Sequence, residues 1–326
     1  MDRLERHASA SSADRLDGLA RKALTAYGLD GARLTRLSST VHTTFEVSIG
    51  DPSRHYALRI CSADRPLDDL QREILWLTAL RRDAGLPVPE PILSMDGKLV
   101  HKVSIAGVSG VRPCVLLRWI EGESLDSELA PEHLRRVGRL VAALHAHAET
   151  FRWPEEITPP RRNATLISEV LDERLLRAHY DDPALRVFQD AVEVIATTMA
   201  TLRDGPNVAG VIHADVHRRN VLFQDDQVGL IGFDRCRWGY YAYDLAVVRS
   251  WIERRENREV LVMAFADGYR AVRPLSEDIG ESVPVFATLR SIDRIQSILS
   301  RPDRGEQSTG ELDRAYETVR GLLEAP

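Results

Sequence analysis

Residues 211–239 read VIHADVHRRNVLFQDDQVGLIGFDRCRWG, and they begin with a histidine, an aspartate and an asparagine at fixed spacing. His213 and Asp215 are separated by one residue, and Asn220 follows five positions after the aspartate. The apolar run directly after Asn220 predicts a strand, and a polar turn separates it from a second apolar run. The stretch thus places three polar side chains in a loop that leads into a predicted hairpin.

The pattern His-x-Asp-x-x-x-x-Asn has the spacing of the catalytic loop in enzymes that transfer phosphoryl groups. In such a loop Asp215 would accept the proton of the attacking hydroxyl or orient it, and Asn220 would ligate the metal ion that bridges the nucleotide phosphates. His213 would hold the loop by packing and hydrogen bonding. A polar loop without chemistry is the alternative. The strands predicted at Val221–Phe223 and Val228–Phe233 favour the catalytic interpretation, because they supply the expected structural context.

The composition is that of a globular protein without a strong charge bias. The chain has 326 residues, of which 44% are hydrophobic and 28% are charged, and its net charge is −6. This length allows two lobes, and the mild acidity argues against a nucleic-acid partner. No apolar run approaches the roughly 20 residues that span a bilayer, so no membrane partner is expected. The three cysteines are far apart, which predicts neither a disulfide framework nor a zinc site and fits a cytoplasmic location.

The first part of the chain reads as strands around one inserted helix. A predicted N-terminal helix precedes three strand-like runs, which lie at Arg33–Leu37, Thr43–Ile49 and His55–Ile60. Pro66 opens a second predicted helix that ends at Gly85. The later part of the chain is predicted to be mainly helical, apart from the hairpin in residues 211–239.

This change of character predicts an α+β, bilobal fold with a β-rich N-lobe and a mainly α-helical C-lobe. The expected N-lobe is residues 1–118, with the N-terminal helix, an antiparallel sheet and the inserted helix. Residues 119–124 form the expected hinge. The expected C-lobe is residues 125–326, with the catalytic loop and substrate-binding helices.

Several segments together resemble the aminoglycoside phosphotransferase-like kinases, a family with a protein-kinase-like fold. YALRI at 56–60 looks like the strand with the phosphate-binding basic residue, and QREILWLTAL at 71–80 looks like the helix with its glutamate partner. HADVHRRNVLF at 213–223 is similar to the catalytic loop. YYAYDLA at 240–246 resembles the segment after the metal-binding turn, and its Asp244 would accept hydrogen bonds from the catalytic-loop backbone. The pattern is closest to the stress response kinase A and homoserine kinase branches.

The resemblance assigns nucleotide-binding roles to four residues of the N-lobe. Arg59 would hold the phosphates, because a guanidinium keeps its charge, and Glu73 would pair with Arg59 and fix it. Ser39 and Thr40 lie in a segment whose backbone N–H groups would approach the phosphates, although it lacks the G-x-G-x-x-G pattern. The alternatives are an exposed strand arginine, a helix-surface glutamate and a plain hairpin loop.

Gly232 departs from the family pattern, which has a metal-binding aspartate at this position. Glycine offers no side-chain ligand, and metal-assisted charge stabilisation contributes several kcal/mol in the transition state. Asp234 is the candidate replacement, because residues two apart in an extended segment point to the same side. The predicted metal ligands are therefore Asn220 and Asp234.

The sequence thus predicts a phosphotransferase that uses ATP or GTP with Mg²⁺ and transfers the γ-phosphoryl group to a hydroxyl, with Asp215 as the base. A small-molecule acceptor is favoured over a protein serine or threonine. The alternative is a catalytically impaired or inactive member that acts as a binding or regulatory module, since Gly232 lacks a ligand atom. The sequence specifies neither the acceptor nor the oligomeric state.

Overall fold

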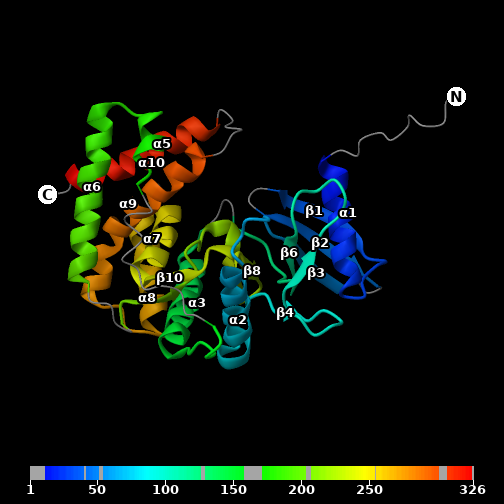
Figure 1. The fold of residues 1–326 in the computed structure, drawn as a ribbon. Helices are drawn as coiled ribbons and strands as arrows, with labels where there is room; N and C mark the ends of the chain where they lie inside the picture. Colours follow the sequence, from blue (N-terminus) through cyan, green and yellow to red (C-terminus); the bar gives the residue numbers. More distant parts are fainter. Residues whose placement is uncertain are drawn as a thin grey trace. The chain divides into compact units, whose positions relative to one another are not determined.

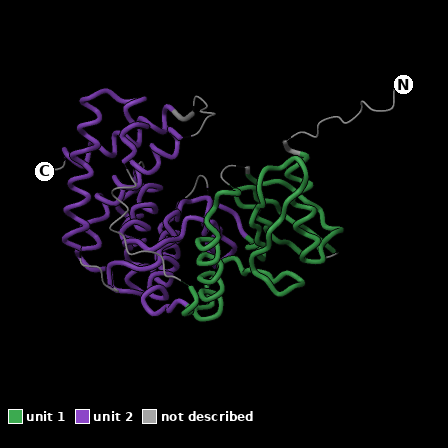
Figure 2. The backbone as a smooth tube through the Cα atoms, in the orientation of Figure 1, with its two compact units in different colours: residues 1–121, 154–157 green, residues 122–153, 158–326 purple. Residues whose placement is uncertain are grey.

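The structure is a computed structural model that describes residues 12–39, 42–50, 54–125, 129–157, 171–202, 207–253, 255–300 and 307–324. The chain divides into two units (Figure 2). Unit 1 contains residues 1–121 and 154–157, and unit 2 contains residues 122–153 and 158–326. The main sheet belongs to unit 1 and most helices belong to unit 2, which confirms the predicted α+β class. The predicted lobe boundaries and hinge stay predictions.

Unit 1 is built on a six-stranded antiparallel sheet (Figure 1). The strands are β1 Arg33–Ser39, β2 Thr43–Ile49, β3 Arg54–Ile60, β4 Pro91–Ile92, β5 His101–Val103 and β6 Arg112–Arg118. Their spatial order is β1-β2-β3-β6-β4, and β5 pairs with β6. The three strands predicted from the sequence correspond to β1, β2 and β3. Because β3 lies between β2 and β6, its Arg59 stands opposite Thr44 on one side and Val115 on the other.

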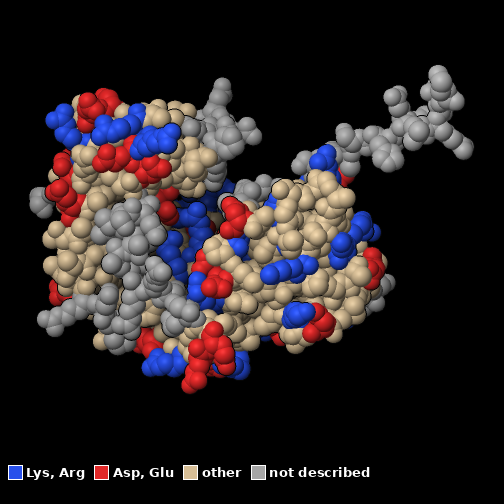
Figure 3. Space-filling model, viewed as in Figure 1, with Lys and Arg blue, Asp and Glu red and all other residues tan. Residues whose placement is uncertain are grey.

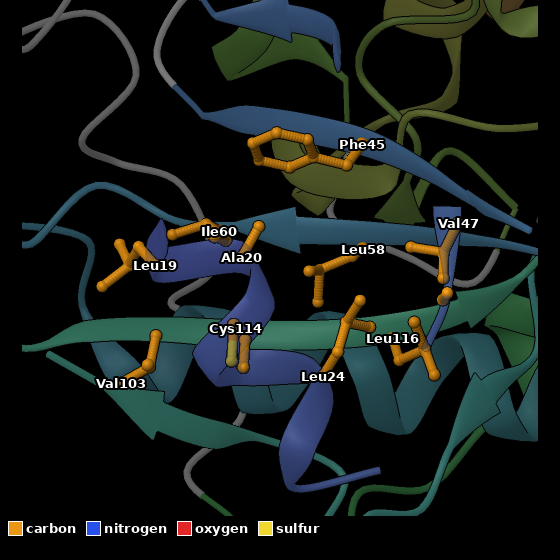
Figure 4. Close-up of a cluster of buried hydrophobic side chains, with 12 residues drawn as sticks. Leu19, Ala20, Leu24, Phe45, Val47, Leu58, Ile60, Val103, Cys114 and Leu116 are labelled. Carbon is orange, nitrogen blue, oxygen red and sulfur yellow. The ribbon is translucent and has the colours of Figure 1, made fainter. Parts of the chain in front are cut away.

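Helix α1, Ser12–Thr25, covers one face of this sheet and completes its core. Apolar residues of α1 recur at helical spacing, so they gather on the face that meets the sheet. The buried cluster combines this helix with four strands (Figure 4): Leu19, Ala20, Leu24, Phe45, Val47, Leu58, Ile60, Val103, Cys114 and Leu116. Burial of each large apolar side chain contributes about 1.5–3 kcal/mol. This core fixes the strand that carries Arg59.

Helix α2, Leu67–Ala84, begins after Pro66 and ends before Gly85, as the sequence predicts. Its buried face carries apolar residues and the acidic Glu73. The apolar residues include Leu70, Ile74, Leu77 and Leu80. The helix therefore turns Glu73 into the interior of unit 1.

Unit 2 consists mainly of helices, with two short sheets (Figure 1). The helices are α3 Pro131–Thr150, α5 Glu173–Arg177, α6 Asp182–Thr201, α7 Tyr241–Ile252, α8 Arg258–Arg270, α9 Glu277–Leu299 and α10 Gln307–Glu324. Strand β7, Ala209–Ile212, pairs antiparallel with β10, Arg237–Tyr240. Strand β8, Val221–Gln224, pairs antiparallel with β9, Gln227–Leu230. The mainly helical character predicted for the later part of the chain is confirmed.

Helices α3 and α8 pack with their backbones in close contact at two glycines. A Cβ atom added at Gly138 would lie 2.2 Å from the carbonyl oxygen of Phe265, and one added at Gly268 would lie 1.9 Å from that of Arg135. Any larger residue at either position would force the helices apart, because protein interiors have no spare volume of this size. The close packing brings His145 of α3 within hydrogen-bond distance of Tyr269 of α8.

The described surface carries charges of both signs. Basic and acidic side chains are interspersed among other residues on the face shown in Figure 3, in keeping with a net charge of only −6. None of the helices in the described ranges has both the length and the apolar composition needed to cross a membrane.

Candidate active site

The polar loop between β7 and β8 is anchored by the fully buried carboxylate of Asp244 in α7. Asp244 Oδ2 accepts the backbone N–H of His213 at 2.9 Å, and Oδ1 accepts that of Ala214 at 2.7 Å. Ala214 has a φ of 62°, a left-handed conformation that costs a residue with a Cβ about 1–2 kcal/mol. The two hydrogen bonds offset this cost and fix the turn that presents Asp215. The role predicted for Asp244 is confirmed.

Asp244 is held in turn by a chain of hydrogen bonds from α3, α8 and Arg273, which follows α8. His145 Nε2 donates to Asp244 Oδ2 at 3.2 Å, and His145 Nδ1 accepts from the Tyr269 hydroxyl at 2.9 Å. Arg273 donates to the same hydroxyl at 2.9 Å. Burial lowers the pKa of His145, so the ring is neutral and can accept from Tyr269. Burial alone would raise the pKa of Asp244, but hydrogen bonds from His145 and His213 lower it and keep the carboxylate ionised.

His213 links the catalytic loop to the segment after β9. Its Nδ1 accepts the backbone N–H of Asp215 at 3.1 Å, and its Nε2 donates to the carbonyl oxygen of Ile231 at 2.9 Å. The edge of its ring meets Phe233, with the ring centroids 4.5 Å apart. His213 therefore holds the loop by packing and hydrogen bonding, as predicted.

The carboxylate of Asp215 forms an ion pair with Arg290 from α9. Arg290 Nη2 lies 2.5 Å from Asp215 Oδ1, whereas His217 Nε2 is 3.7 Å from Oδ2 and beyond hydrogen-bond distance. Burial opposes the charge on Arg290, but Tyr243 and Asp215 outweigh it and raise the pKa of Arg290. Burial also lowers the pKa of His217, which keeps that ring neutral. One carboxylate oxygen of Asp215 is thus fixed by a permanent cation.

Arg290, which contacts Asp215, was not predicted from the sequence. It lies 75 positions after Asp215, and no local spacing connects the two residues. Its Nη1 also lies 3.8 Å from Asp293 Oδ2, the oxygen that accepts from the Tyr243 hydroxyl at 3.2 Å. Helix α9 packs beside α7, and this long-range packing brings Arg290 to Asp215.

Asn220 ends the catalytic loop in the short 3-10 turn η1, Arg218–Asn220. Its Nδ2 donates to the carbonyl oxygen of Asp215 at 2.9 Å, which fixes the orientation of the amide. An amide oxygen of this kind is a suitable ligand for a hard divalent cation. Asn220 Oδ1 therefore fits the predicted role of metal ligand, which stays a prediction.

Gly232 lies where the chain leaves β9 and enters a second 3-10 turn, η2, Phe233–Arg235. The predicted strand through Phe233 is wrong, because β9 ends at Leu230 and Gly232 has φ 79° and ψ 44°. A left-handed residue breaks the alternation of an extended strand. Gly232 and Asp234 therefore do not alternate as residues of an extended strand do, although Asp234 in η2 stays the predicted carboxylate ligand.

The side chain of Asn220 occupies the space beside Gly232. A Cβ at position 232 would lie 2.5 Å from Asn220 Nδ2 and 2.6 Å from both Cγ and Oδ1. An aspartate at this position would therefore meet the Asn220 amide and would also need an unfavourable positive φ. Among the residues that the structure describes, no three His, Cys, Asp or Glu side chains gather as they would around a metal ion.

Arg59 and Glu73 form a buried ion pair within unit 1. Arg59 Nη2 lies 2.6 Å from Glu73 Oε1. The predicted pairing is confirmed, and the alternatives of an exposed strand arginine and a helix-surface glutamate are wrong. The nucleotide-binding roles of these residues stay predictions. Ser39 is the last residue of β1, and Thr40 lies outside the described residues.

Curated proteins with similar sequences include several homoserine kinases. The enzyme from Sinorhizobium medicae (strain WSM419) is 32% identical over 62% of this chain and 60% of its own length. The enzyme from Neisseria meningitidis serogroup B is 31% identical over 73% of this chain and 76% of its own length. This chain spans about 60% of the length of the Sinorhizobium enzyme and of two other homoserine kinases.

Solved structures show the same fold over almost the whole chain. A microcompartment-associated aminopropanol kinase superposes with a TM-score of 0.80 at 25% identity, over 94% of this chain and 96% of that one. The amicoumacin kinase hAmiN, in complex with AMP-PNP and Ca²⁺, superposes with a TM-score of 0.79 at 16% identity, over 94% and 93%. The protein-kinase-like fold predicted from the sequence is confirmed.

The sequence profile of the phosphotransferase enzyme family matches residues 33–277, a range that contains the Arg59–Glu73 pair and the catalytic loop. The resemblance inferred from the motifs is thereby confirmed. The chain belongs to the phosphotransferase enzyme family.

Proposed function

We propose that the chain is an ATP-dependent phosphotransferase that transfers the γ-phosphoryl group to a hydroxyl of a small molecule. The anchored catalytic loop carries this proposal. A buried carboxylate, Asp244, holds a strained Ala214 so that Asp215 and Asn220 are presented together. Strain of this kind persists only where surrounding contacts enforce it, and it is common at functional sites.

Asp215 acts as the base in the proposed reaction. Its Oδ1 is engaged by Arg290, so the acceptor hydroxyl donates to Oδ2. That oxygen takes up the proton as the acceptor oxygen bonds to the γ-phosphorus. The bond from the γ-phosphorus to the bridging oxygen breaks, and ADP leaves. Positioning and charge neutralisation contribute most of the rate in this class of reaction.

Arg59, fixed by Glu73, is proposed to contact the phosphates of ATP or GTP, with backbone N–H groups near Ser39 and Thr40 as further donors. A divalent cation, Mg²⁺ in this proposal, would be held by Asn220 Oδ1 and the carboxylate of Asp234. Such an ion, when bound, neutralises charge on the phosphate oxygens. Gly232 contributes no ligand atom to it.

The acceptor is proposed to be a small amino alcohol or hydroxy amino acid and not a protein. Support comes from the relatives, which are named as kinases of homoserine and aminopropanol. A cytoplasmic location is also proposed, because Cys61, Cys114 and Cys236 are all free thiols.

The proposal is tested by a transfer assay with γ-labelled ATP and Mg²⁺ against a panel of small amino alcohols and hydroxy amino acids. Label should appear in at least one acceptor with the unmodified chain and should be lost with Asp215→Asn. Asp234→Ala should raise the Mg²⁺ concentration that half-maximal transfer requires, or abolish transfer. Transfer that persists at full rate in Asp215→Asn would contradict the mechanism.

A second candidate function is a non-catalytic binding or regulatory module. Gly232 favours it, because the position has no ligand atom and its side-chain space is filled by Asn220. Calorimetric titration of ATP with and without Mg²⁺ separates the two functions. Binding that is independent of the metal, together with no transfer to any acceptor, would support the second.

A further inference from the structure

Glu73 binds two arginines, although the sequence predicted one. Its Oε1 accepts from Arg59 at 2.6 Å, and its Oε2 accepts from Arg65 at 2.8 Å. The side chains of Arg59, Arg65 and Glu73 are only 8%, 11% and 0% exposed. Two cations and one anion therefore share a nearly buried cluster in unit 1, with an excess of one positive charge.

Two acidic groups lie near this cluster, the Cys61 thiol and the Asp64 carboxylate. Burial raises the pKa of Cys61, so that thiol stays protonated despite the two nearby guanidiniums. A hydrogen bond from the Ser62 hydroxyl lowers the pKa of Asp64, whose carboxylate also interacts with His42; because Asp64 is fully exposed, water screens that interaction. A partly buried excess charge is unfavourable unless an opposite charge offsets it. The cluster is therefore suited to an anion.

Arg65 also reaches the segment between β1 and β2. Its Nη1 lies 2.8 Å from His42 Nε2, and the backbone N–H of Ser62 lies 3.2 Å from His42 Nδ1. Both neighbours can only donate, whereas a neutral imidazole accepts at only one of its nitrogens. One of the two contacts thus brings two N–H groups face to face. An acceptor oxygen between Arg65 and His42 would relieve this conflict, because both side chains could donate to it.

We propose that Arg59 and Arg65 form a two-arginine clamp for nucleotide phosphates, with Glu73 as their shared brace and His42 as an additional donor. This inference rests on the proposed function and adds Arg65 and His42 to its binding site. A guanidinium has five N–H donors in a planar fork, so a bond to Glu73 leaves donors for phosphate oxygens. If Arg65 were only a brace for the turn before α2, its loss would affect folding but not the discrimination between nucleotide and nucleoside.

The test is calorimetric binding of ATP, ADP and adenosine to Arg65→Gln, with Arg82→Gln as the matched control. Arg82 lies on α2 in the same unit, is 70% exposed and pairs with the adjacent Asp83. Loss of a charged hydrogen bond corresponds to roughly a 10- to 100-fold loss of affinity. We expect that loss for ATP and ADP with Arg65→Gln, little change for adenosine, and no change for any ligand with Arg82→Gln.

Equal weakening of adenosine and ATP, or unchanged ATP affinity, would overturn the clamp. If Arg65→Gln fails to fold, Arg65→Lys replaces it, because lysine keeps the charge but loses the planar fork of donors. Arg65→Lys should also lower the affinity for ATP and ADP while the affinity for adenosine stays the same. Binding needs no turnover, so selective loss of ATP by a chain that transfers no phosphoryl group would sustain the clamp and refute the proposed function. A wild-type chain that binds neither ATP nor inorganic tripolyphosphate would overturn the clamp itself.

Discussion

Replacement of Gly232 by alanine should destabilise the folded chain by about 1.5–3.5 kcal/mol through two separate effects. The first is backbone strain, because φ is 79° at this position and a left-handed conformation costs a residue with a Cβ about 1–2 kcal/mol. The second is displacement of Asn220, whose Nδ2 would lie 2.5 Å from the new Cβ. Moving the amide breaks its hydrogen bond to the Asp215 carbonyl, a loss of about 0.5–1.5 kcal/mol.

A double-mutant cycle separates these two effects. All three Asn220 atoms that crowd the new Cβ lie beyond the Cβ of Asn220, so Asn220→Ala removes them. In that background Gly232→Ala should cost only the strain of about 1–2 kcal/mol. Gly97→Ala is an independent control for the strain, because Gly97 has φ 77° and a Cβ there would meet nothing within 4 Å.

The measurement is urea denaturation followed by circular dichroism, with the unfolding free energies of the four variants of the cycle compared. A coupling free energy near zero, or a cost of Gly232→Ala equal to that of Gly97→Ala, would refute the steric argument. The same reasoning predicts that Gly232→Asp, which restores the family residue, lowers stability and does not raise Mg²⁺ affinity unless Asn220 is also replaced. Tighter Mg²⁺ binding by Gly232→Asp at unchanged stability would show that Asn220 moves aside without cost.

Three further outcomes are expected. Asp215→Asn should reduce turnover by roughly 10²–10⁴-fold while the calorimetric affinity for ATP and the melting temperature stay the same, and unchanged turnover would remove Asp215 from the mechanism. Arg290→Met should lower kcat by roughly 10- to 100-fold with a smaller change in KM. Arg290→Lys should recover part of this loss of kcat, because lysine keeps the positive charge beside Asp215. Equal kcat values for the two variants would exclude the charge as the cause. Burial lowers the pKa of His145 in the folded chain below its ordinary value of 6.5. Below pH 6.5 the unfolded chain therefore binds more protons than the folded chain, and the unfolding free energy should decrease as the pH falls. His145→Gln should flatten this decrease in urea titrations between about pH 5 and 8, and an unaltered slope would contradict the assignment of a neutral buried ring.

The loop predicted to be catalytic could be located from the sequence because its parts are consecutive in the chain. His213, Asp215 and Asn220 lie within one loop, and the strand and turn after them follow from local patterns of apolar and polar residues. Helix α2 was equally accessible, since Pro66 and Gly85 mark its ends and its apolar spacing is regular. The contact between Asp244 and the loop was predicted only through the family resemblance.

Local patterns failed where a single backbone angle or a distant partner decides the structure. The apolar run through Phe233 predicted a longer strand, but the left-handed Gly232 ends the extended backbone and starts a 3-10 turn. Pro284 lies inside α9, where sequence rules favour a helix boundary, and the helix nevertheless continues to carry Arg290. Tertiary packing outweighs the local preference in both places.

The sequence by itself determined the α+β class, the first three strands, helix α2 and the position of the loop predicted to be catalytic, because these follow from periodicity and from spacing within short segments. The tertiary structure decided which arginines form ion pairs with which carboxylates. Arg290 reaches Asp215 across 75 positions, and Arg65 joins Arg59 on the two oxygens of Glu73. It also decided that Asn220 fills the space beside Gly232. Ion pairs and steric exclusion depend on distances of a few ångströms between elements that are remote in the chain, and no periodicity of the sequence encodes those distances.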